Sequence, residues 1–547
     1  MTDAEHRPAG RVPVARDLNV RAKLTNENEA VQKLDEVIKT KEVKEEESAQ
    51  KPVELDKNLD EMKEQEKDQQ REILPKPLNP SPAEETDAEE TDAMRKEKIR
   101  EMMRSAWVAY RNYSWGANEL KPIAKTSHNQ NIFGGSGMAA TIVDGADTLY
   151  IMGLKEEYEQ ARDFIRDNFD IKKATGQLSV FETTIRFVGG LLTMYGLTKE
   201  KFYLDKAKSV ADVLLPAFNT PTGIAKSLLS PGGSASNYGW AGSSSILAEF
   251  GTLHLEFAYL TEVTGDPVYL EKVQKIRDTL DKADKPDGLY PTYMSAETGR
   301  FANNHVSLGA LGDSFYEYLI KSWVMSGKTD EQALRMHKAA SDAIQKKMVF
   351  TSKKGLRYVA ELRGGSPEHK MGHLACFAPG MFALEAHYET NSERKATVMG
   401  LAEDLANTCH ESYIRSETRI GPEMFYFTDS YEAITQGGDS GYILRPEVLE
   451  GFFYLWRLTG KQKYKDWVWD GISAIEKHCR IDSGGYAGLK NVYKPQDGHD
   501  DVQQSFFLAE TLKYAYLTFA DDAIPLDRWV FNTEAHPLPI KNAPISP

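Results

Sequence analysis

The sequence predicts an all-α protein in which helices pair with one another and close into a barrel. Apolar residues recur at helical spacing through most of the chain after residue 94, and few segments alternate with the period of two that strands require. Glycine residues recur where these helices are expected to end. Length does not decide the number of domains, because 547 residues fit one large barrel or several smaller units.

The helical periodicity defines the expected elements. Helices are expected at residues 183–197, 249–264, 314–325, 446–458, 464–478 and 502–520. In the second of these, Phe250, Leu253, Phe257 and Leu260 form one apolar stripe. The spacing indicates helix pairs that recur about every 50–70 residues. Residues 350–361 are the exception, and there we expect short strands or a hairpin.

The first 95 residues differ in composition from the rest. They are rich in Lys, Glu, Gln, Asp and Pro, and the run at 39–72 has too few apolar residues to offset the entropy of ordering the chain. We therefore expect a charged, disordered stalk at 1–95, a globular catalytic domain at 96–540 and a short tail at 541–547.

Charge and hydropathy exclude several classes of protein. The net charge of -15 argues against nucleic acid as a partner, because phosphates require a basic face. No apolar stretch approaches the roughly 20 residues of a membrane span, and the first ten residues lack the apolar core of a signal peptide. We expect no transmembrane segment, and we expect a monomer. Three cysteines allow one disulfide bond and one free thiol, or three buried thiols.

Acidic residues recur at the starts of apolar helices. Glu182 and Arg186 are spaced i,i+4, as are Asp313 and Glu317, so each pair shares a helix face. Glu447 and Glu450 repeat the pattern, and Glu249 and Glu510 interrupt apolar runs. Taken singly, such acids fit helix caps or first-turn positions favoured by the helix dipole. Taken together, they favour a polar cavity, and carboxylates among aromatic side chains suit carbohydrate chemistry.

Several long stretches, in order along the chain, carry a resemblance to a known family. They are 137–149 (GMAATIVDGADTL), 181–192 (FETTIRFVGGLL), 247–257 (LAEFGTLHLEF), 312–321 (GDSFYEYLIK), 369–381 (HKMGHLACFAPGM), 444–450 (LRPEVLE), 503–514 (QQSFFLAETLKY) and 531–537 (FNTEAHP). The chain from about residue 94 to 539 resembles glycoside hydrolase family 47, the class I α-1,2-mannosidases. The resemblance implies an (α/α)7 barrel of seven helix pairs, plugged at one end by a short β-hairpin.

The resemblance also implies roles for individual acids. Glu182 matches the acid that protonates the leaving oxygen, and Glu447 matches the base that activates water. Asp313 matches a further essential carboxylate for which the acid role is an alternative, and Glu423 matches another acid of the site. The resemblance implies an inverting mechanism, which requires two carboxyls with room for water between them.

A calcium ion and a sugar pocket follow from the same resemblance. Thr533 matches the protein ligand of Ca²⁺, through its hydroxyl and its carbonyl, which leaves most positions open for water and sugar hydroxyls. The matching pocket residues, which hold the sugar or the waters around calcium, are Arg186, Glu249, Glu317, His373, Arg445, Phe506, Glu510 and Glu534.

Three further expectations rest on single positions. Cys376 and Cys409 match the family's disulfide pair, which implies an oxidising lumen and leaves Cys479 as the free thiol. Leu311, two residues before Asp313, matches a position where endoplasmic-reticulum-type enzymes carry arginine, so the chain resembles the Golgi type. That branch is usually membrane-anchored, and we expect a Golgi lumenal location.

The expected activity is removal of terminal α-1,2-linked mannose from high-mannose N-linked glycans, with inversion and dependence on calcium. One alternative is a relative that binds and trims glycans in glycoprotein quality control, and another is a lectin without turnover. The complete set of acids favours the hydrolase.

Overall fold

The computed structural model describes residues 91–130, 132–435 and 437–544. The predicted stalk at 1–95 therefore lies almost wholly outside the described residues, as does the end of the predicted tail. The first described helix, α3 (Asp92–Ser114), begins before the predicted domain boundary at residue 96. Thr91 explains this start, because its hydroxyl caps the helix by accepting a hydrogen bond from the Met94 amide at 3.3 Å.

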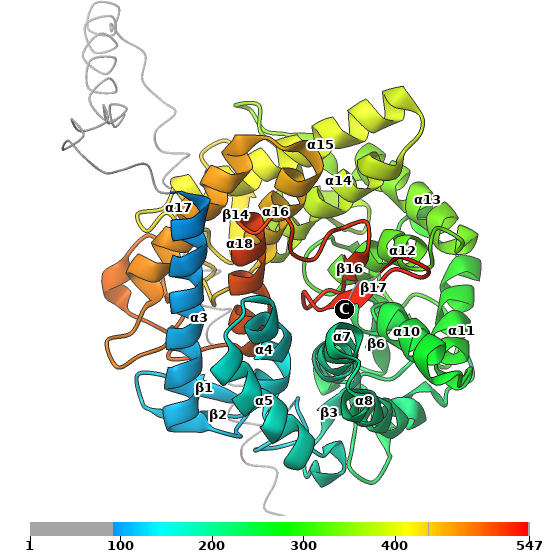
Figure 1. Ribbon diagram of the computed structural model, residues 1–547. Helices are drawn as coiled ribbons and strands as arrows, with labels where there is room; N and C mark the ends of the chain where they lie inside the picture. The colour runs from blue at the N-terminus through cyan, green and yellow to red at the C-terminus, as the bar shows by residue number, and fades with distance from the viewer. Residues whose placement is uncertain (1–90, 131, 436, 545–547) are drawn as a thin grey trace, which may run out of the picture. The chain divides into compact units, whose positions relative to one another are not determined.

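Two concentric sets of helices make up the described part of the chain (Figure 1). The inner helices are α4 (Ala140–Ile151), α7 (Gly189–Thr198), α10 (His254–Thr264), α12 (Asp313–Met325), α14 (Ala378–Tyr388), α16 (Glu447–Thr459) and α18 (Leu512–Thr518). Their outer partners are, in the same order, α5 (Lys155–Asp167), α8 (Lys201–Leu214), α11 (Val268–Lys282), α13 (Glu331–Lys347), α15 (Ser392–Ile414), α17 (Gln462–Cys479) and α3.

Side-chain polarity decides which helices lie inside. Inner α4 buries every residue from 140 to 149, whereas outer α5 buries only a stripe of Tyr158, Ala161 and Ile165. Each inner helix packs against the next, and α4 closes the ring against the π-helical turn η8 (Phe507–Thr511) that leads into α18. Within the described residues this gives seven helix pairs, which confirms the predicted (α/α)7 barrel.

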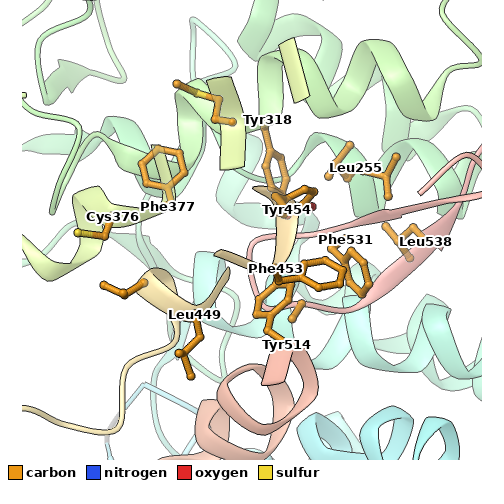
Figure 2. Close-up of a cluster of buried hydrophobic side chains, with 14 of the residues drawn as sticks. Leu255, Tyr318, Cys376, Phe377, Leu449, Phe453, Tyr454, Tyr514, Phe531 and Leu538 are labelled. Atoms are coloured by element: carbon orange, nitrogen blue, oxygen red, sulfur yellow. The ribbon is translucent and has the colours of Figure 1, made fainter. Parts of the chain in front are cut away.

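A β-hairpin occupies the interior of the barrel (Figure 1). Strand β16 (Trp529–Phe531) pairs antiparallel with β17 (Pro537–Pro539), and the pair packs against α7, α10 and α12. All six strand residues are buried. Figure 2 shows Phe531 of β16 beside Phe453 of α16 and Tyr514 of α18, with ring centroids 5.3–5.7 Å apart. The hairpin therefore belongs to the hydrophobic core and holds the turn between its strands in a fixed place.

Short sheets connect the helices at the barrel rim. They are β1 (Glu119–Lys121) with β2 (Thr126–His128), β3 (Leu178–Ser179) with β4 (Leu228–Leu229) and β5 (Ala235–Ser236), β6 (Ser244–Ile246) with β7 (Tyr293–Ser295), β11 (Glu361–Arg363) with β8 (His305–Val306) and β12 (Ser366–Glu368), and β13 (Lys370–Gly372), β14 (Met424–Phe427) and β15 (Glu432–Ile434). The hairpin expected at 350–361 is present as β9 (Val349–Thr351) and β10 (Arg357–Val359).

Two predicted helices contain turns that periodicity did not show. The helix expected at 183–197 begins with α6 (Val180–Glu182) and a π-helical turn, η2 (Thr183–Val188), before α7. The helix expected at 502–520 starts later, because Gln503 bridges to Leu120 instead, and it opens with the π-helical turn η8. A π-helical turn contains one extra residue, which rotates the side chains that follow it about the helix axis. It does not change the residue composition, so the pattern of apolar residues does not reveal it.

The helix expected at 249–264 is in fact two helices, α9 (Leu247–Phe250) and α10, separated by residues 251–253. Gly251 accounts for the break, since a Cβ atom there would lie 2.7 Å from both the Leu247 carbonyl oxygen and the Phe315 ring. The close approach of α12 therefore requires glycine, and the break lets α9 direct Glu249 toward the barrel axis.

The predicted disulfide bond joins Cys376 to Cys409, with Cα atoms 6.0 Å apart. It ties the 3-10 helix η6 (His373–Phe377) to α15, and the loop it closes is worth about 3–4 kcal/mol in the chain-entropy account. Cys479 is free and buried. Among the described residues, no helix combines the length and hydropathy that crossing a membrane requires.

Candidate active site

A cavity of about 310 Å³ opens among the N-terminal ends of the inner helices. Eight carboxyl side chains line it, together with two arginines: Glu182, Glu249, Asp313, Glu317, Glu447, Glu450, Glu510 and Glu534, with Arg186 and Arg445. Phe506, Leu311 and Thr533 also line the wall. The barrel thus gathers acids that lie up to 352 residues apart, from Glu182 to Glu534. Such a concentration of like charge requires cations, protons or hydroxyl ligands to balance it.

Helix starts place several of these acids. Asp313 is the first residue of α12, Glu447 is the first of α16, and Glu182 ends the short α6. An acid at a helix N-terminus is favoured by the helix dipole, which is why these positions tolerate a charge in an apolar setting. The two π-helical turns supply Arg186 and Glu510, consistent with the frequent use of such turns at functional sites.

Arg186 links the wall of the cavity to its floor. Its Nε donates to Glu182 Oε2 at 2.9 Å, and its Nη1 donates to Asp144 Oδ2 at 3.1 Å and to Glu534. Burial opposes ionisation of Asp144, but Arg186, His536 and Ser505 together outweigh burial and lower the pKa of Asp144 to about 2. The guanidinium therefore fixes three carboxylates from three different parts of the chain.

Glu447 sits among cations and donors. His373 Nδ1 donates to Glu447 Oε2 at 2.7 Å, and His373 Nε2 bonds the Tyr413 hydroxyl at 2.7 Å. Arg445 lies 3.8 Å from Glu447 Oε1, and it pairs through Nε with both oxygens of Glu423 at 2.8 Å. Burial by itself raises the pKa of Glu447, but the His373 bond and the Arg445 charge outweigh it and hold the pKa below its ordinary value.

Asp313 lies in the opposite electrostatic setting. Burial raises the pKa of Asp313 to about 7, and the charges of Glu317 and Glu447 add to the rise. A hydrogen bond from the Ser314 amide at 2.8 Å opposes the rise without cancelling it. Burial also raises the pKa of Glu249 to about 7, and Glu249 Oε2 has no hydrogen-bond partner within the described residues. Both carboxyls can therefore carry a proton near neutral pH.

Two acids of the cavity, Glu317 and Glu450, lie close to the same lysine. Lys321 of α12 is buried, pairs with Glu317 and lies 3.9 Å from Glu450. Burial holds the pKa values of Glu450 and Glu510 well above the ordinary range, and neighbouring carboxylates add to the shift. Without a bound cation, burial and mutual repulsion thus favour the protonated forms of these carboxyls on the cavity floor.

The hairpin turn between β16 and β17 brings Thr533 to this floor. Asn532 anchors the turn, because its Nδ2 donates to the Ile185 carbonyl oxygen at 2.8 Å and to Glu256 Oε1 at 2.7 Å. The Thr533 amide donates to the Tyr318 hydroxyl at 3.3 Å. Two separate hydrogen-bonding groups therefore fix the orientation of the Thr533 backbone.

Beneath the turn lies a fully buried ionic network. His536 bonds Asp147 Oδ2 at 2.9 Å through Nδ1 and Asp144 Oδ1 at 3.1 Å through Nε2. Lys513 Nζ donates to Asp147 at 2.8 Å and to the Ala535 carbonyl oxygen at 2.6 Å. Burial lowers the pKa of His536, but Asp147 and Asp144 outweigh it and raise the pKa above its ordinary value. The network ties the turn to α4 and α18.

The floor suits a hard cation that keeps most of its water. Within the described residues, no group of three or more His, Cys, Asp or Glu side chains is arranged to hold a metal directly. Thr533, in contrast, offers oxygen atoms at the centre of an acidic floor, and carboxyls such as Glu249, Glu510 and Glu534 can accept hydrogen bonds from metal-bound water. The donor set therefore fits Ca²⁺ and does not fit zinc, which prefers His and Cys ligands.

Most of the predicted site residues lie together. Glu182, Arg186, Glu249, Asp313, Glu317, Arg445, Glu447, Phe506, Glu510, Thr533 and Glu534 all line the cavity, and their individual roles remain predictions. His373 and Glu423 do not line it, and each contacts a residue that does. Sequence reasoning missed Tyr413, Lys321 and the Asp144–Asp147–His536–Lys513 network, although a charged residue in an apolar helix, such as Lys321, was a visible signal.

A barrel of paired helices with an acidic cavity lined by aromatic side chains is the kind of site that suits an enzyme acting on carbohydrate. Residues 102–540 match the model of glycosyl hydrolase family 47, and the chain belongs to that family. Two relatives are the "Mannosyl-oligosaccharide 1,2-alpha-mannosidase mans-2" of Caenorhabditis elegans, 62% identical over 450 residues, and the "Mannosyl-oligosaccharide 1,2-alpha-mannosidase IB" of Homo sapiens, 52% identical over 450 residues. The alignments cover 82% of this chain in both cases and 76% and 70% of those proteins.

A solved structure agrees with these relatives. The "alpha-1,2-mannosidase from Trichoderma reesei" superposes with a TM-score of 0.76 at 28% identity, covering 83% of this chain and all of that one. Fold and family thus agree with the sequence-based expectation.

Proposed function

We propose that this chain hydrolyses terminal α-1,2-linked mannose from high-mannose N-linked glycans during N-glycan processing. The relatives reported above, including the solved structure, are all named 1,2-α-mannosidases. The observation that carries the proposal is one cavity holding two carboxyls, Asp313 and Glu447, whose pKa values are displaced in opposite directions. Such a pair supplies an acid and a base for glycosidic bond cleavage.

Glu447 acts in this proposal as the base that takes a proton from the attacking water. The His373 and Arg445 contacts favour its ionised form, so it is available to accept that proton at neutral pH. Asp313 holds a proton near neutral pH and supplies it toward the leaving oxygen. Glu182, bonded to Arg186 on the same cavity wall, contributes to proton delivery or to orientation of the leaving group.

The reaction proceeds with inversion of configuration in this proposal. Inversion requires room for a water molecule between the acid, Asp313 at the start of α12, and the base, Glu447 at the start of α16. The test is proton NMR of the first product formed from a nine-mannose glycan. Initial release of β-mannose supports inversion, whereas initial release of α-mannose contradicts it.

Thr533 would hold Ca²⁺, and Glu249, Glu510 and Glu534 would hold its water ligands. A bound calcium ion would supply Lewis-acid binding of sugar hydroxyls and would balance carboxylate charge in the cavity. Arg186 and Asn532 hold the surrounding groups in place through hydrogen bonds. Calorimetric titration of the chelated protein with Ca²⁺ tests this assignment, since absence of binding would contradict it.

A Golgi lumenal location follows from the same proposal. Leu311 occupies the cavity rim where the Golgi-type enzymes lack arginine, and the disulfide bond suits an oxidising lumen. Immunofluorescence of the full-length protein against Golgi and reticulum markers tests this location.

The quality-control and lectin alternatives are not favoured, because the cavity contains the carboxyls that hydrolysis needs as acid and base. Mass spectrometry of a nine-mannose glycan after incubation is the direct test, and loss of no hexose would overturn the hydrolase proposal.

A further inference from the structure

Glu119 is a buried carboxyl that the proposed chemistry does not use. It is 1% exposed and lies on β1, directly opposite His128 of β2. His128 Nδ1 donates to Glu119 Oε2 at 2.9 Å, and Gln130 Nε2 donates to the same oxygen at 3.2 Å. A carboxyl removed from water is costly unless it is hydrogen-bonded, and these two donors satisfy only one of its oxygens.

The other oxygen of Glu119 holds the segment of chain that enters the cavity wall. Oε1 accepts a hydrogen bond from the Ser505 backbone amide at 3.0 Å, across 386 residues of sequence. Beside it, the Leu120 carbonyl oxygen accepts from the Gln503 amide at 2.9 Å. Phe506 follows directly along the chain and lines the cavity. Strand β1 thus fixes this segment just before it reaches the cavity.

The side chain of Ser505 extends the connection to the charged wall. Its hydroxyl donates to Asp144 Oδ2 and accepts a hydrogen bond from Arg186 Nη1 at 3.3 Å. The Arg186 guanidinium also lies 5.7 Å from the centroid of the Phe506 ring, within the range of a cation–π contact. The backbone whose amide Glu119 holds therefore places two neighbouring side chains, Ser505 and Phe506, against Arg186.

The Ser505 amide requires a partner from outside its own helix. The helical stretch that contains η8 begins at Ser505, and the first four amides of a helix have no acceptor within it. Glu119 supplies that acceptor from a distant strand, and the helix dipole favours a carboxylate at this end. Without Glu119 a buried amide would be left unpaired, which is costly enough to shift the backbone toward another acceptor.

We propose that Glu119 is a positioning residue for sugar binding, which holds Phe506 directly through the backbone and Arg186 through Ser505. The inference rests on the proposed hydrolase activity and adds to it a residue that does not line the cavity. A small displacement of groups that hold a substrate weakens its binding. A carboxyl that only supported the fold would affect stability and leave the binding of substrate unchanged.

The test measures KM and kcat for α-1,2-mannobiose, together with Tm, in the calcium-loaded enzyme. Glu119→Leu deletes both acceptor oxygens and should raise KM by about 3–10-fold. The change in kcat should stay within about threefold, since Glu119 contacts neither Asp313 nor Glu447 within the described residues. Glu119→Gln keeps one oxygen for the Ser505 amide and should restore KM to within about twofold of the wild type.

Glu389→Leu is the matched control. Glu389 is also a buried carboxyl that accepts backbone amides before a helix, from Thr390 at 2.8 Å and from Asn391 at 2.9 Å, and it does not line the cavity. This variant should lower Tm and leave KM unchanged. Should Glu119→Leu fail to fold, Glu119→Asp takes its place. It keeps the charge beside His128 but is one methylene too short to reach the Ser505 amide, so it should raise KM in the same way.

A rise in KM that Glu119→Gln restores and that Glu389→Leu lacks supports the proposal. Unchanged KM in Glu119→Leu, or in Glu119→Asp where that variant replaces it, would overturn the proposal even if Tm fell, because Glu119 would then serve the fold alone. A fall in kcat without a rise in KM would also overturn it. Both of these results leave the hydrolase proposal intact, whereas a wild-type protein that cleaves no substrate would overturn the proposed activity and this inference together.

Discussion

The surroundings of Asp313 and Glu447 differ more than the two residues themselves. Each is a carboxylic acid at the first position of an inner helix, and both line the same cavity. Glu447 contacts His373 and lies near Arg445, whereas Asp313 receives one backbone hydrogen bond and is close to further acids. The consequence is a lowered pKa for Glu447 and a pKa of about 7 for Asp313.

The comparison teaches that the helix start places a carboxyl but does not determine its protonation. The helix dipole acts on both residues in the same direction, so it cannot separate their pKa values. Their surroundings do so. Burial raises the pKa of Asp313, and the charges of Glu317 on the same helix and of Glu447 add to the rise. On the Glu447 side, His373 and Arg445 outweigh burial and lower the pKa. Two carboxyls with opposite protonation at neutral pH are the arrangement that acid–base hydrolysis requires.

The largest expected effect comes from removing the base. Glu447→Gln should lower kcat by about 100-fold or more, because the amide cannot accept a proton from water. Initial rates on a nine-mannose glycan measure it. Glu385→Gln is the matched control: Glu385 also contacts a histidine, His337, at 3.0 Å, but lies away from the cavity. A Glu447→Gln enzyme with near-normal turnover would remove Glu447 from the mechanism.

Removing the acid should lower kcat by a factor similar to, or slightly smaller than, that for removing the base. Its effect on stability should be opposite to that of removing the base. Asp313→Asn should lower kcat by about 100-fold, and Glu182→Gln should also lower it, by an amount that apportions proton delivery between them. Because the pKa of Asp313 is raised, folding opposes its ionisation, and wild-type stability falls as pH rises from about 4 to about 7.

Asp313→Asn removes this cost, so its Tm should exceed that of the wild type at pH 7 by about 1–3 °C and match it near pH 4. For Glu447 the sign is reversed: its lowered pKa adds stability above about pH 4.5 that is lost as pH falls, so Glu447→Gln should lower Tm at pH 7. Calorimetry at fixed calcium measures both. If the two variants shifted Tm in the same direction, the contrast between the two sites would be wrong.

The third prediction weakens the contrast without removing either carboxyl. His373→Leu deletes the 2.7 Å hydrogen bond to Glu447, which should raise the pKa of Glu447 toward its ordinary value. Since the base must be ionised, the acid limb of the kcat/KM profile should move to higher pH by the same amount. Tyr413→Phe, which acts on Glu447 only through His373, should move it less. An unchanged acid limb in His373→Leu would show that Glu447 does not set it.

The fourth prediction concerns calcium binding at Thr533, on the cavity floor, separately from the roles of Asp313 and Glu447. Thr533→Val keeps the side-chain shape but deletes a hydroxyl, so calcium affinity should fall about 10–100-fold by calorimetric titration. Calcium should then raise Tm less than it does in the wild type. Thr408→Val, which deletes a hydroxyl on outer helix α15, is the control and should bind calcium normally. Wild-type calcium affinity in Thr533→Val would argue against this ligand.

The smallest effect is expected at the rim. Leu311 lines the cavity at a φ of +77°, and its carbonyl oxygen accepts a hydrogen bond from the Ala248 amide at 3.0 Å. Leu and Arg meet the same backbone strain at that φ, so Leu311→Arg changes only the side chain. The new guanidinium adds fixed hydrogen-bond donors, so cleavage of some branches should slow about 3–10-fold and the order of mannose release should change. The rate of the preferred cleavage should stay within twofold. Identical isomer time courses for both proteins would exclude Leu311 as a determinant of branch preference.

Much of the site was predictable because its residues carry local signals. Asp313 and Glu317 share a helix face as their spacing predicts, and Glu182 bonds Arg186 as an i,i+4 pair. The disulfide bond between Cys376 and Cys409 was expected from resemblance and is present. The π-helical turns and the break at Gly251 were not predictable, since they depend on how closely neighbouring helices approach.

The sequence by itself determined the helical periodicity, the family and the identity of the acids, because each of these is written in residue types at short spacing. Only the tertiary structure decided which carboxyl keeps its proton, since the pKa of Glu447 depends on His373, 74 residues away, and Arg186 reaches Glu534 across 348 residues. Electrostatic and stacking energies depend on distance in space, and chain folding alone sets that distance.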